Sequence, residues 1–150
     1  MSLGKLLDQI KIDTNIWKSP IHGLQHWRDV EKNGLFLARG KEINLNIISY
    51  FSYLHDCCRE NENNDPLHGP RAARYAKTHR HLFDLNDIEF KLLLRACSGH
   101  TFADPSNVIG FDKTISICWD ADRLDLTRVG IKPDPRRLFT EEARIICEGN

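Results

Sequence analysis

The chain has 150 residues, and its 21 lysine and arginine residues equal its 21 aspartate and glutamate residues in number. A chain of this length is typical of a single domain, and it buries about two-thirds of its unfolded surface on folding. Because the charges balance, the composition gives no indication of a nucleic-acid polymer or a membrane surface as partner. We therefore expect one domain over residues 1–150 with a small molecule as its partner.

The five cysteines are odd in number and show no CxxC spacing of the kind that binds structural zinc. Reduced thiols in the cytoplasm fit this pattern best. No stretch approaches the roughly 18 consecutive apolar residues of a membrane span. The first residues, "MSLGKLLDQIKIDTN", contain too short an apolar run for a secretory signal. A soluble cytoplasmic protein is therefore expected.

Apolar residues recur at helical spacing along most of the chain, and alternating strand patterns are absent. The segment 44–58 is apolar almost all round, which predicts a central helix packed on several sides. The fold class is therefore expected to be all-α, a bundle of about five to seven helices. The other predicted helices span about residues 22–38, "RAARYAKTH" after Pro70, "IEFKLLLRAC" capped by Asp84 or Asn86, residues 113–128, and a short segment that begins at Thr140.

The stretch "YLHDCCRE" places an imidazole and a carboxylate at the end of the most apolar predicted helix. His55 shares a helical stripe with Ile48 and Phe51, so its ring is expected to point inward. Asp56 follows about 100° round the helix. A buried carboxylate costs several kcal/mol unless it is paired or bound to a cation. A positive charge is therefore expected beside Asp56.

A second pair of candidate ligands lies in "HGLQHW", where His22 and His26 are four residues apart and share one face of a predicted helix. Two imidazoles at this spacing can serve one metal ion. Taken alone the pair is a weak signal, because histidines at this spacing are more often surface residues or satisfied core residues.

Helical geometry separates the aspartates of "ISICWDADRLDLTRVG". Asp122 interrupts a stripe that otherwise faces the core, whereas Asp120 lies on a polar stripe that we expect to be solvated. Asp122 is therefore the better candidate for an interior site, although a shift of a few residues in the helix boundary would reverse that preference.

The order of these residues resembles the HD superfamily of metal-dependent phosphohydrolases, whose signature is H…HD…D and whose fold is a helical bundle. The matching residues are His26, the adjacent His55 and Asp56, and Asp122 within "ADRL". The resemblance covers about residues 20–130 and implies a single HD domain. The blocks "HGLQHW", "HGPRAA" and "DADRLD" are most similar to those of small stand-alone HD proteins. The asparagine that follows "ADRLH" in the stringent-response hydrolases is replaced here by "ADRLDL".

The resemblance implies that His26, His55, Asp56 and Asp122 bind one divalent cation and leave positions for water. Mixed imidazole and carboxylate ligands suit Mn, Fe, Zn, Co or Ni better than Mg. The implied activity is hydrolysis of a small phosphorylated metabolite, with a nucleotide the favoured class, by attack of a metal-bound hydroxide. The substrate, the native metal and the oligomeric state stay open.

Some members of the superfamily hold a second ion, and the resemblance then implies His68 and His100 as its ligands. Otherwise these histidines contact the substrate or donate a proton to its leaving group. The plainest alternative is that His68 flanks its helix and His100 lies in a solvated loop. Related enzymes often carry a lysine or arginine three residues after the HD aspartate, so the resemblance implies that Arg59 binds phosphate oxygens. The alternative for Arg59 is a surface ion pair with Glu60 or Glu62.

Two other functions stay open for the same fold. An HD module that holds its cation but does not turn over a substrate would show ligand-dependent stabilisation without product. A minority of HD proteins use two irons to activate dioxygen. Two irons per chain, held with the help of His68 and His100, would favour that oxygenase.

Overall fold

The structure, a computed structural model, describes residues 2–108, 110 and 112–149. Within these ranges the chain forms seven α-helices and no β-strand, so the predicted all-α bundle is confirmed. The α-helices are α1 (Ser2–Asp13), α2 (Leu24–Leu37), α3 (Leu45–Leu54), α4 (His68–Thr78), α5 (Asp87–Gly99), α6 (Lys113–Leu124) and α7 (Glu141–Glu148). Short 3₁₀ segments between them are η1 (Ile16–Lys18), η2 (Arg80–Leu82), η3 (Asp125–Val129) and η4 (Pro135–Arg137).

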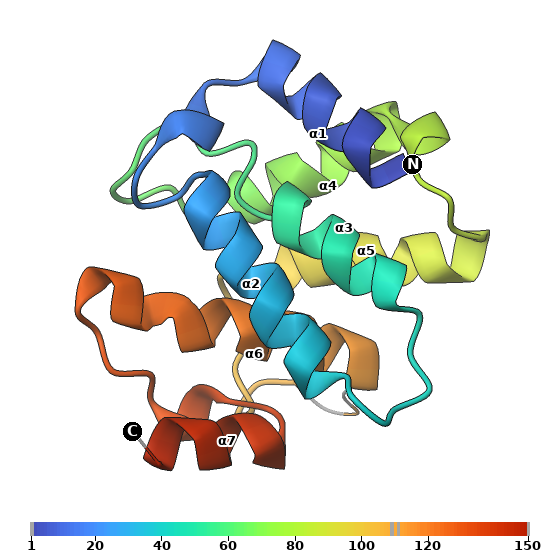
Figure 1. Ribbon diagram of the computed structural model, residues 1–150. Coiled ribbons are helices and arrows are strands. Elements are labelled where there is room, and N and C mark those ends of the chain that lie inside the picture. Colours follow the sequence, from blue (N-terminus) through green and yellow to red (C-terminus); the bar gives the residue numbers. More distant parts are fainter. Residues whose placement is uncertain (1, 109, 111, 150) are drawn as a thin grey trace.

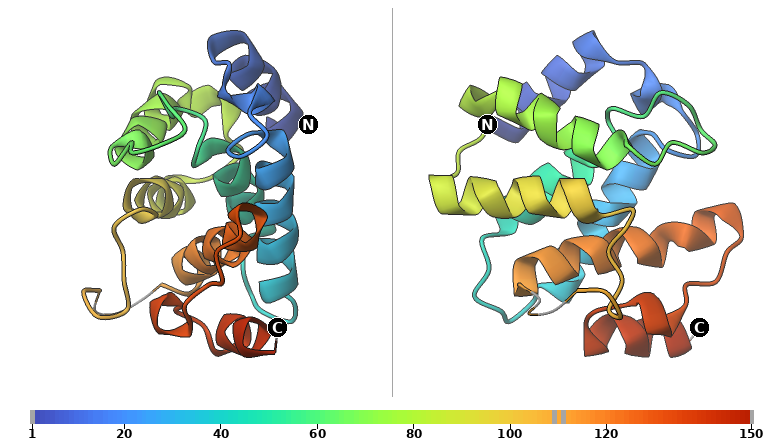
Figure 2. Two further views of the ribbon diagram at one scale, coloured as in Figure 1. Left: turned by 90° about the vertical axis from the view of Figure 1, so that its left-hand side faces the viewer. Right: turned by 180° about the vertical axis from the view of Figure 1, so that it is seen from behind.

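The helices form two layers around a common core. Figure 2 shows α2 and α3 on one side and α4, α5 and α6 stacked on the other. The most extensive contacts join α2 to α3, α2 to α6, and α4 to α5. In Figure 1, α1 covers one end of this arrangement and α7 the opposite end. The C-terminal end of α3 therefore lies between the two layers, where buried groups from several helices can meet.

Helix α3 ends earlier than the sequence predicted. It stops at Leu54, whereas the prediction continued to residue 58. The Ser52 carbonyl, which would accept the Asp56 N–H in a continuing helix, accepts the His55 Nδ1–H at 2.9 Å. The chain then turns, with a hydrogen bond from Cys57 N to Leu54 O. This early end frees Asp56 from the helix and places it at the junction of the layers.

Helix α1 was not predicted from the sequence. Its residues Leu6 and Ile10 are fully buried in the same hydrophobic core as the fully buried Trp27 of α2 and Phe51 of α3. Their four-residue spacing is helical, so the pattern was present in the sequence. Among the described residues, no helix combines the length and the apolar character that crossing a bilayer requires.

A glycine sets the distance between the helices that frame the interior. A Cβ atom at Gly34 of α2 would lie 2.5 Å from Ile48 Cγ2 of α3 and 3.5 Å from Ala121 Cβ of α6. Only a hydrogen fits at the first of these contacts. The missing side chain therefore lets α2 approach α3 and α6 closely.

Candidate metal centre

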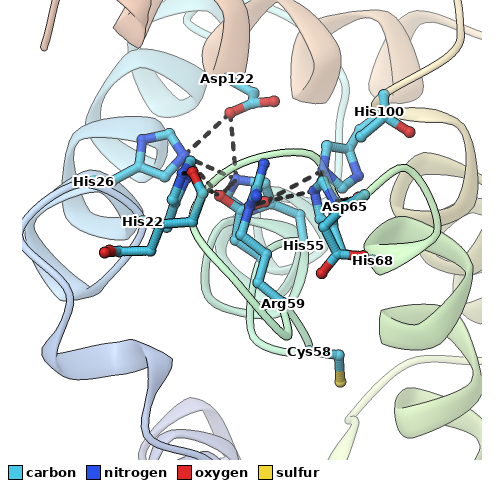
Figure 3. Close-up of polar contacts among 12 residues, drawn as sticks. His22, His26, His55, Cys58, Arg59, Asp65, His68, His100 and Asp122 are labelled. Atoms are coloured by element: carbon cyan, nitrogen blue, oxygen red, sulfur yellow. Dashed lines mark hydrogen bonds and ion pairs between the residues drawn. The ribbon is translucent and has the colours of Figure 1, made fainter. Parts of the chain in front are cut away.

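Three helices bring side chains that can ligate a metal to one point (Figure 3). His26 lies on α2, His55 follows the last residue of α3, and Asp122 lies in the last turn of α6. His26 Nε2 is 3.1 Å from His55 Nε2 and 3.2 Å from Asp122 Oδ1. His55 Nε2 is 3.3 Å from the same oxygen. Three residues predicted as ligands are thus brought together.

The carboxylate of Asp56 faces histidines on both sides. Its Oδ2 lies 3.4 Å from His26 Nε2 and 3.7 Å from His55 Nε2. Its Oδ1 lies 2.9 Å from His68 Nε2 and 3.4 Å from His100 Nε2. His68 and His100 are buried, so the alternative of a solvated His100 is wrong. Two buried groups that could each hold a metal ion therefore share Asp56.

The outer ring nitrogen, Nδ1, points away from the cluster in all four histidines, which are His26, His55, His68 and His100. Each Nδ1–H donates to an oxygen that can only accept a hydrogen bond. The outer nitrogen therefore carries the proton, and the inner Nε2 presents a lone pair to the cluster in the neutral ring. Histidines that bind metals are oriented in this way in most proteins. The outer bonds run from His26 to Asp125 Oδ2 (2.7 Å), from His55 to Ser52 O (2.9 Å), from His100 to Cys97 O (2.7 Å) and from His68 to Asp65 O.

The electrostatics of the cluster favour a positive charge at its centre. Burial lowers the pKa of His26, but hydrogen bonds with three carboxylates outweigh burial and raise that pKa to about 11. The carboxylates belong to Asp122, Asp125 and Asp56. Burial raises the pKa of Asp56 and of Asp122, but the facing histidines outweigh it and hold both pKa values well below the ordinary value. Facing acceptors in a buried site need a proton or a metal ion between them.

The spacing of the inner atoms fits a transition-metal ion. Ligands about 2.1 Å from one ion lie about 3.0–3.4 Å from one another in octahedral or tetrahedral geometry. The inner atoms of His26, His55 and Asp122 are separated by 3.1–3.3 Å, and those of Asp56 lie 3.4 and 3.7 Å from the two imidazoles. Imidazole nitrogens mixed with carboxylate oxygens suit Mn, Fe, Co, Ni or Zn.

Arg59 lines a cavity of about 450 Å³ that opens onto the cluster. Its side chain is 12% exposed, and its Nε lies 3.8 Å from Asp56 Oδ1. This nitrogen is buried and has no hydrogen-bond partner among the described residues. The ion pair of Arg59 is thus with Asp56 rather than with Glu60 or Glu62. Arg59 is placed where a buried donor could meet an anion in the cavity.

Asp120 is not solvated, and the prediction of a polar stripe on the outer face of α6 is wrong. Its side chain is fully buried. It accepts hydrogen bonds from Phe139 N at 2.8 Å and from both the backbone N–H and the hydroxyl of Thr140. The segment before α7 covers this face of α6, which the pattern within α6 alone does not reveal. Asp120 therefore anchors the C-terminal segment, and Asp122 faces the cluster.

Two residues that hold the cluster in place were not predicted as site residues. Asp125 accepts the outer proton of His26, and its position three residues after Asp122 on the same face was a signal for it. Asp65 binds the Arg71 guanidinium and accepts the Glu60 N–H at 2.7 Å. These bonds fix the loop that carries Arg59, and no helical pattern in the sequence pointed to them.

A second cavity, of about 730 Å³, lies between α2 and the C-terminal segment. Phe36, Ile131 and Lys32 are among the residues that line it. Among the described residues, no histidine or carboxylate contributes to its wall. Its wall carries the Cys147 thiol and the Lys32 ammonium, but none of the imidazoles and carboxylates that are brought together in the histidine and aspartate cluster.

Comparison of the chain with protein-family models, with curated proteins and with solved structures found no match in any of the three. The function is therefore inferred from the geometry and chemistry of the cluster.

Proposed function

We propose that the protein is a metal-dependent phosphohydrolase of the HD type that acts on a small phosphate ester, with a nucleotide the favoured class. The observation that carries the proposal is the buried carboxylate of Asp56, whose two oxygens each face the lone pairs of two imidazoles. A carboxylate so placed is suited to bridge two cations. The arrangement agrees with the resemblance of the sequence to the HD superfamily.

The four residues His26, His55, Asp56 and Asp122 would hold one divalent ion, and Asp56 with His68 and His100 would hold a second. When bound, a divalent ion supplies Lewis acidity toward a phosphoryl oxygen and lowers the pKa of bound water toward neutrality.

Recognition of phosphate is assigned to arginines in the wall of the cavity. Arg59, Arg123 and Arg128 all line it. Arg123 donates to the carbonyls of Arg137, Ala103 and His100, which orient the guanidinium without neutralising its charge. Guanidinium groups bind phosphate oxygens through several N–H donors at once. The Nε of Arg59, which has no hydrogen-bond partner among the described residues and lies 3.8 Å from Asp56 Oδ1, would contact the phosphoryl group that reacts.

The rest of the cavity sets the size and character of the substrate. Its volume of about 450 Å³ falls within the range of small-molecule sites. Ile21, Leu126 and Val129 provide an apolar wall for the organic part of an ester. A phosphate with a compact organic group therefore fits the cavity better than a nucleic-acid strand does.

The test is phosphate release from an aryl phosphate and a nucleotide panel by protein loaded separately with Mn, Co, Ni and Zn. We expect activity with at least one metal, and we expect His55→Ala to lose metal and to lower turnover more than about 100-fold. This limit follows because mutation of a residue that only hydrogen-bonds to a metal ligand already lowers metal affinity or activity about 10–100-fold. His81→Ala, which alters an exposed histidine outside the cluster, is the control. Unchanged metal content and activity in His55→Ala would refute the proposal.

Two other outcomes of the same panel have distinct meanings. Retention of metal with no product, together with ligand-dependent stabilisation, would identify a binding module. The two groups of possible metal ligands that share Asp56 also suit a di-iron oxygenase. Two irons per chain and oxygen consumption, lost in both His68→Ala and His100→Ala, would identify that function.

A further inference from the structure

His22 lies beside the cluster but outside the four-residue pattern of the HD resemblance (Figure 3). The residue precedes α2 and is 8% exposed. Its Nδ1 lies 3.6 Å from Asp56 Oδ2, the oxygen that also faces His26 and His55. Among the described residues this buried nitrogen has no hydrogen-bond partner. A buried polar atom left unsatisfied costs about 1–3 kcal/mol, so a partner is to be expected.

The other nitrogen of the ring determines what that partner can be. His22 Nε2 lies 3.1 Å from the carbonyl oxygen of Glu62, which can only accept. Nε2 therefore carries the proton of the neutral ring, and Nδ1 presents a lone pair toward Asp56 Oδ2. Two acceptors 3.6 Å apart are too close for a water molecule to lie between them. Their separation is close to the roughly 3.0–3.4 Å expected for neighbouring ligands of one ion.

The turn before α2 is built to hold His22 in this position. Ser19 Oγ accepts the backbone N–H of His22 at 3.0 Å and also hydrogen-bonds to the Glu62 carboxylate. A Cβ atom at Gly23 would lie 2.5 Å from the Trp17 carbonyl oxygen. Glycine is therefore required after His22 for the turn to close beneath the ring. The loop between α3 and α4 contacts this turn through the Glu62 carboxylate and orients the His22 ring through the Glu62 carbonyl oxygen.

We infer that His22 is a further ligand of the metal centre, bound through Nδ1 to the ion that His26, His55, Asp56 and Asp122 would hold. This inference rests on the proposed function, and it adds a residue that the H…HD…D pattern does not contain. It also gives a role to the paired histidines of "HGLQHW". His26 presents Nε2 from within α2, whereas His22 presents Nδ1 from the turn that precedes it.

The experiment measures Co²⁺ binding by the metal-free 150-residue chain in competition with a chromophoric chelator. We expect His22→Ala to weaken Co²⁺ binding at least tenfold. Mutation of a residue that only hydrogen-bonds to a metal ligand already lowers metal affinity roughly 10–100-fold, and tenfold is the lower end of that range. His22→Gln, which keeps an amide donor for the Glu62 carbonyl, is the second variant should the alanine variant fail to fold. His81→Ala is the matched control and should leave the affinity unchanged.

A spectroscopic readout separates a ligand from a residue that only positions others. The imidazole N–H protons of Co²⁺ ligands are shifted far from the normal proton NMR range. His22 Nε2–H, held by the Glu62 carbonyl, should give one such exchangeable signal that is missing from both His22 variants. Unchanged affinity, or an unchanged set of shifted signals, in the folded variants would overturn the inference and leave the metal centre in place. Failure of the unaltered protein to bind any of Co²⁺, Mn²⁺, Ni²⁺ and Zn²⁺ would overturn both.

Discussion

Replacing Gly34 with alanine tests whether the close crossing of α2 against α3 and α6 depends on the missing side chain at this position. The new Cβ would lie 2.5 Å from Ile48 Cγ2, where carbon atoms in contact are normally about 3.5–4.0 Å apart. The helices must separate by about 1 Å, or Ile48 must leave its rotamer. Overpacking of this kind costs about 1–3 kcal/mol. Alanine recovers about 0.8–1.0 kcal/mol through its higher helix propensity, so we expect a net loss of about 1 kcal/mol.

Urea unfolding followed by circular dichroism measures this loss. Gly4→Ala is the matched control, because a Cβ at Gly4 of α1 meets nothing within 4 Å. The control should be neutral or more stable by up to about 1 kcal/mol. The two substitutions are chemically identical, so a loss of stability at Gly34 without a loss at Gly4 would isolate the steric contact.

The decisive comparison repeats Gly34→Ala in an Ile48→Ala background. Ile48→Ala alone removes a fully buried side chain and should cost about 2–5 kcal/mol. It also removes the methyl group that the new Cβ would meet, so Gly34→Ala should no longer destabilise the protein. Because only the gain in helix propensity then remains, the expected coupling between the two substitutions is about 2 kcal/mol, the size of the overpacking cost. An equal cost of Gly34→Ala in both backgrounds would show that the contact with Ile48 does not set the helix spacing.

Three further predictions follow from single contacts. Asp120→Ala leaves the N–H groups of Phe139 and Thr140 without their acceptor, so it should lower the free energy of unfolding in urea by about 2–4 kcal/mol. The metal content of Asp120→Ala should be unchanged, whereas Asp122→Ala should lose metal. Loss of metal in Asp120→Ala would contradict the assignment of Asp122 as the ligand. Burial opposes ionisation of Asp65, but hydrogen bonds from Arg71 and the Glu60 N–H hold its pKa below the ordinary value. The ionised Asp65 carboxylate therefore stabilises the folded state above its unfolded pKa of about 3.9, and this stabilisation is lost as the pH falls through the lower pKa of the folded state. The free energies of unfolding of the wild type and of Asp65→Asn should differ at neutral pH and converge in acid. Iodoacetamide should label Cys58 first in the native protein, because Cys58 is partly exposed and the other four cysteines are buried. Mass spectrometry measures the order of labelling, and equally fast labelling of a buried cysteine would contradict it.

Much of the candidate metal centre could be predicted because several of the residues proposed as ligands follow helical periodicity. His55 lies on the inward stripe of an apolar helix, and Asp122 interrupts a core-facing stripe of another. Both features are local, so a single sequence displays them. The order His26, His55 and Asp56, Asp122 then added the resemblance to a known signature. The all-α class followed from the same periodicity and from the absence of alternating strand patterns.

The parts that could not be predicted depend on contacts between distant segments. The burial of Asp120 is caused by Phe139 and Thr140, which lie 19 and 20 residues farther along the chain. The orientation of His22 depends on the backbone carbonyl of Glu62, and a backbone carbonyl leaves no trace in side-chain patterns. The early end of α3 arises because a histidine ring takes a carbonyl that the helix would otherwise use. Each of these is a tertiary effect that overrides a local preference.

The central claim is that the buried carboxylate of Asp56 exists to bind cations on its two sides. Crystals grown with Mn²⁺ and measured for anomalous scattering test this directly. We predict one peak among His26, His55, Asp56 and Asp122, and a second beside His68 and His100. Manganese found only at surface carboxylates, with no peak in contact with Asp56, would contradict the account.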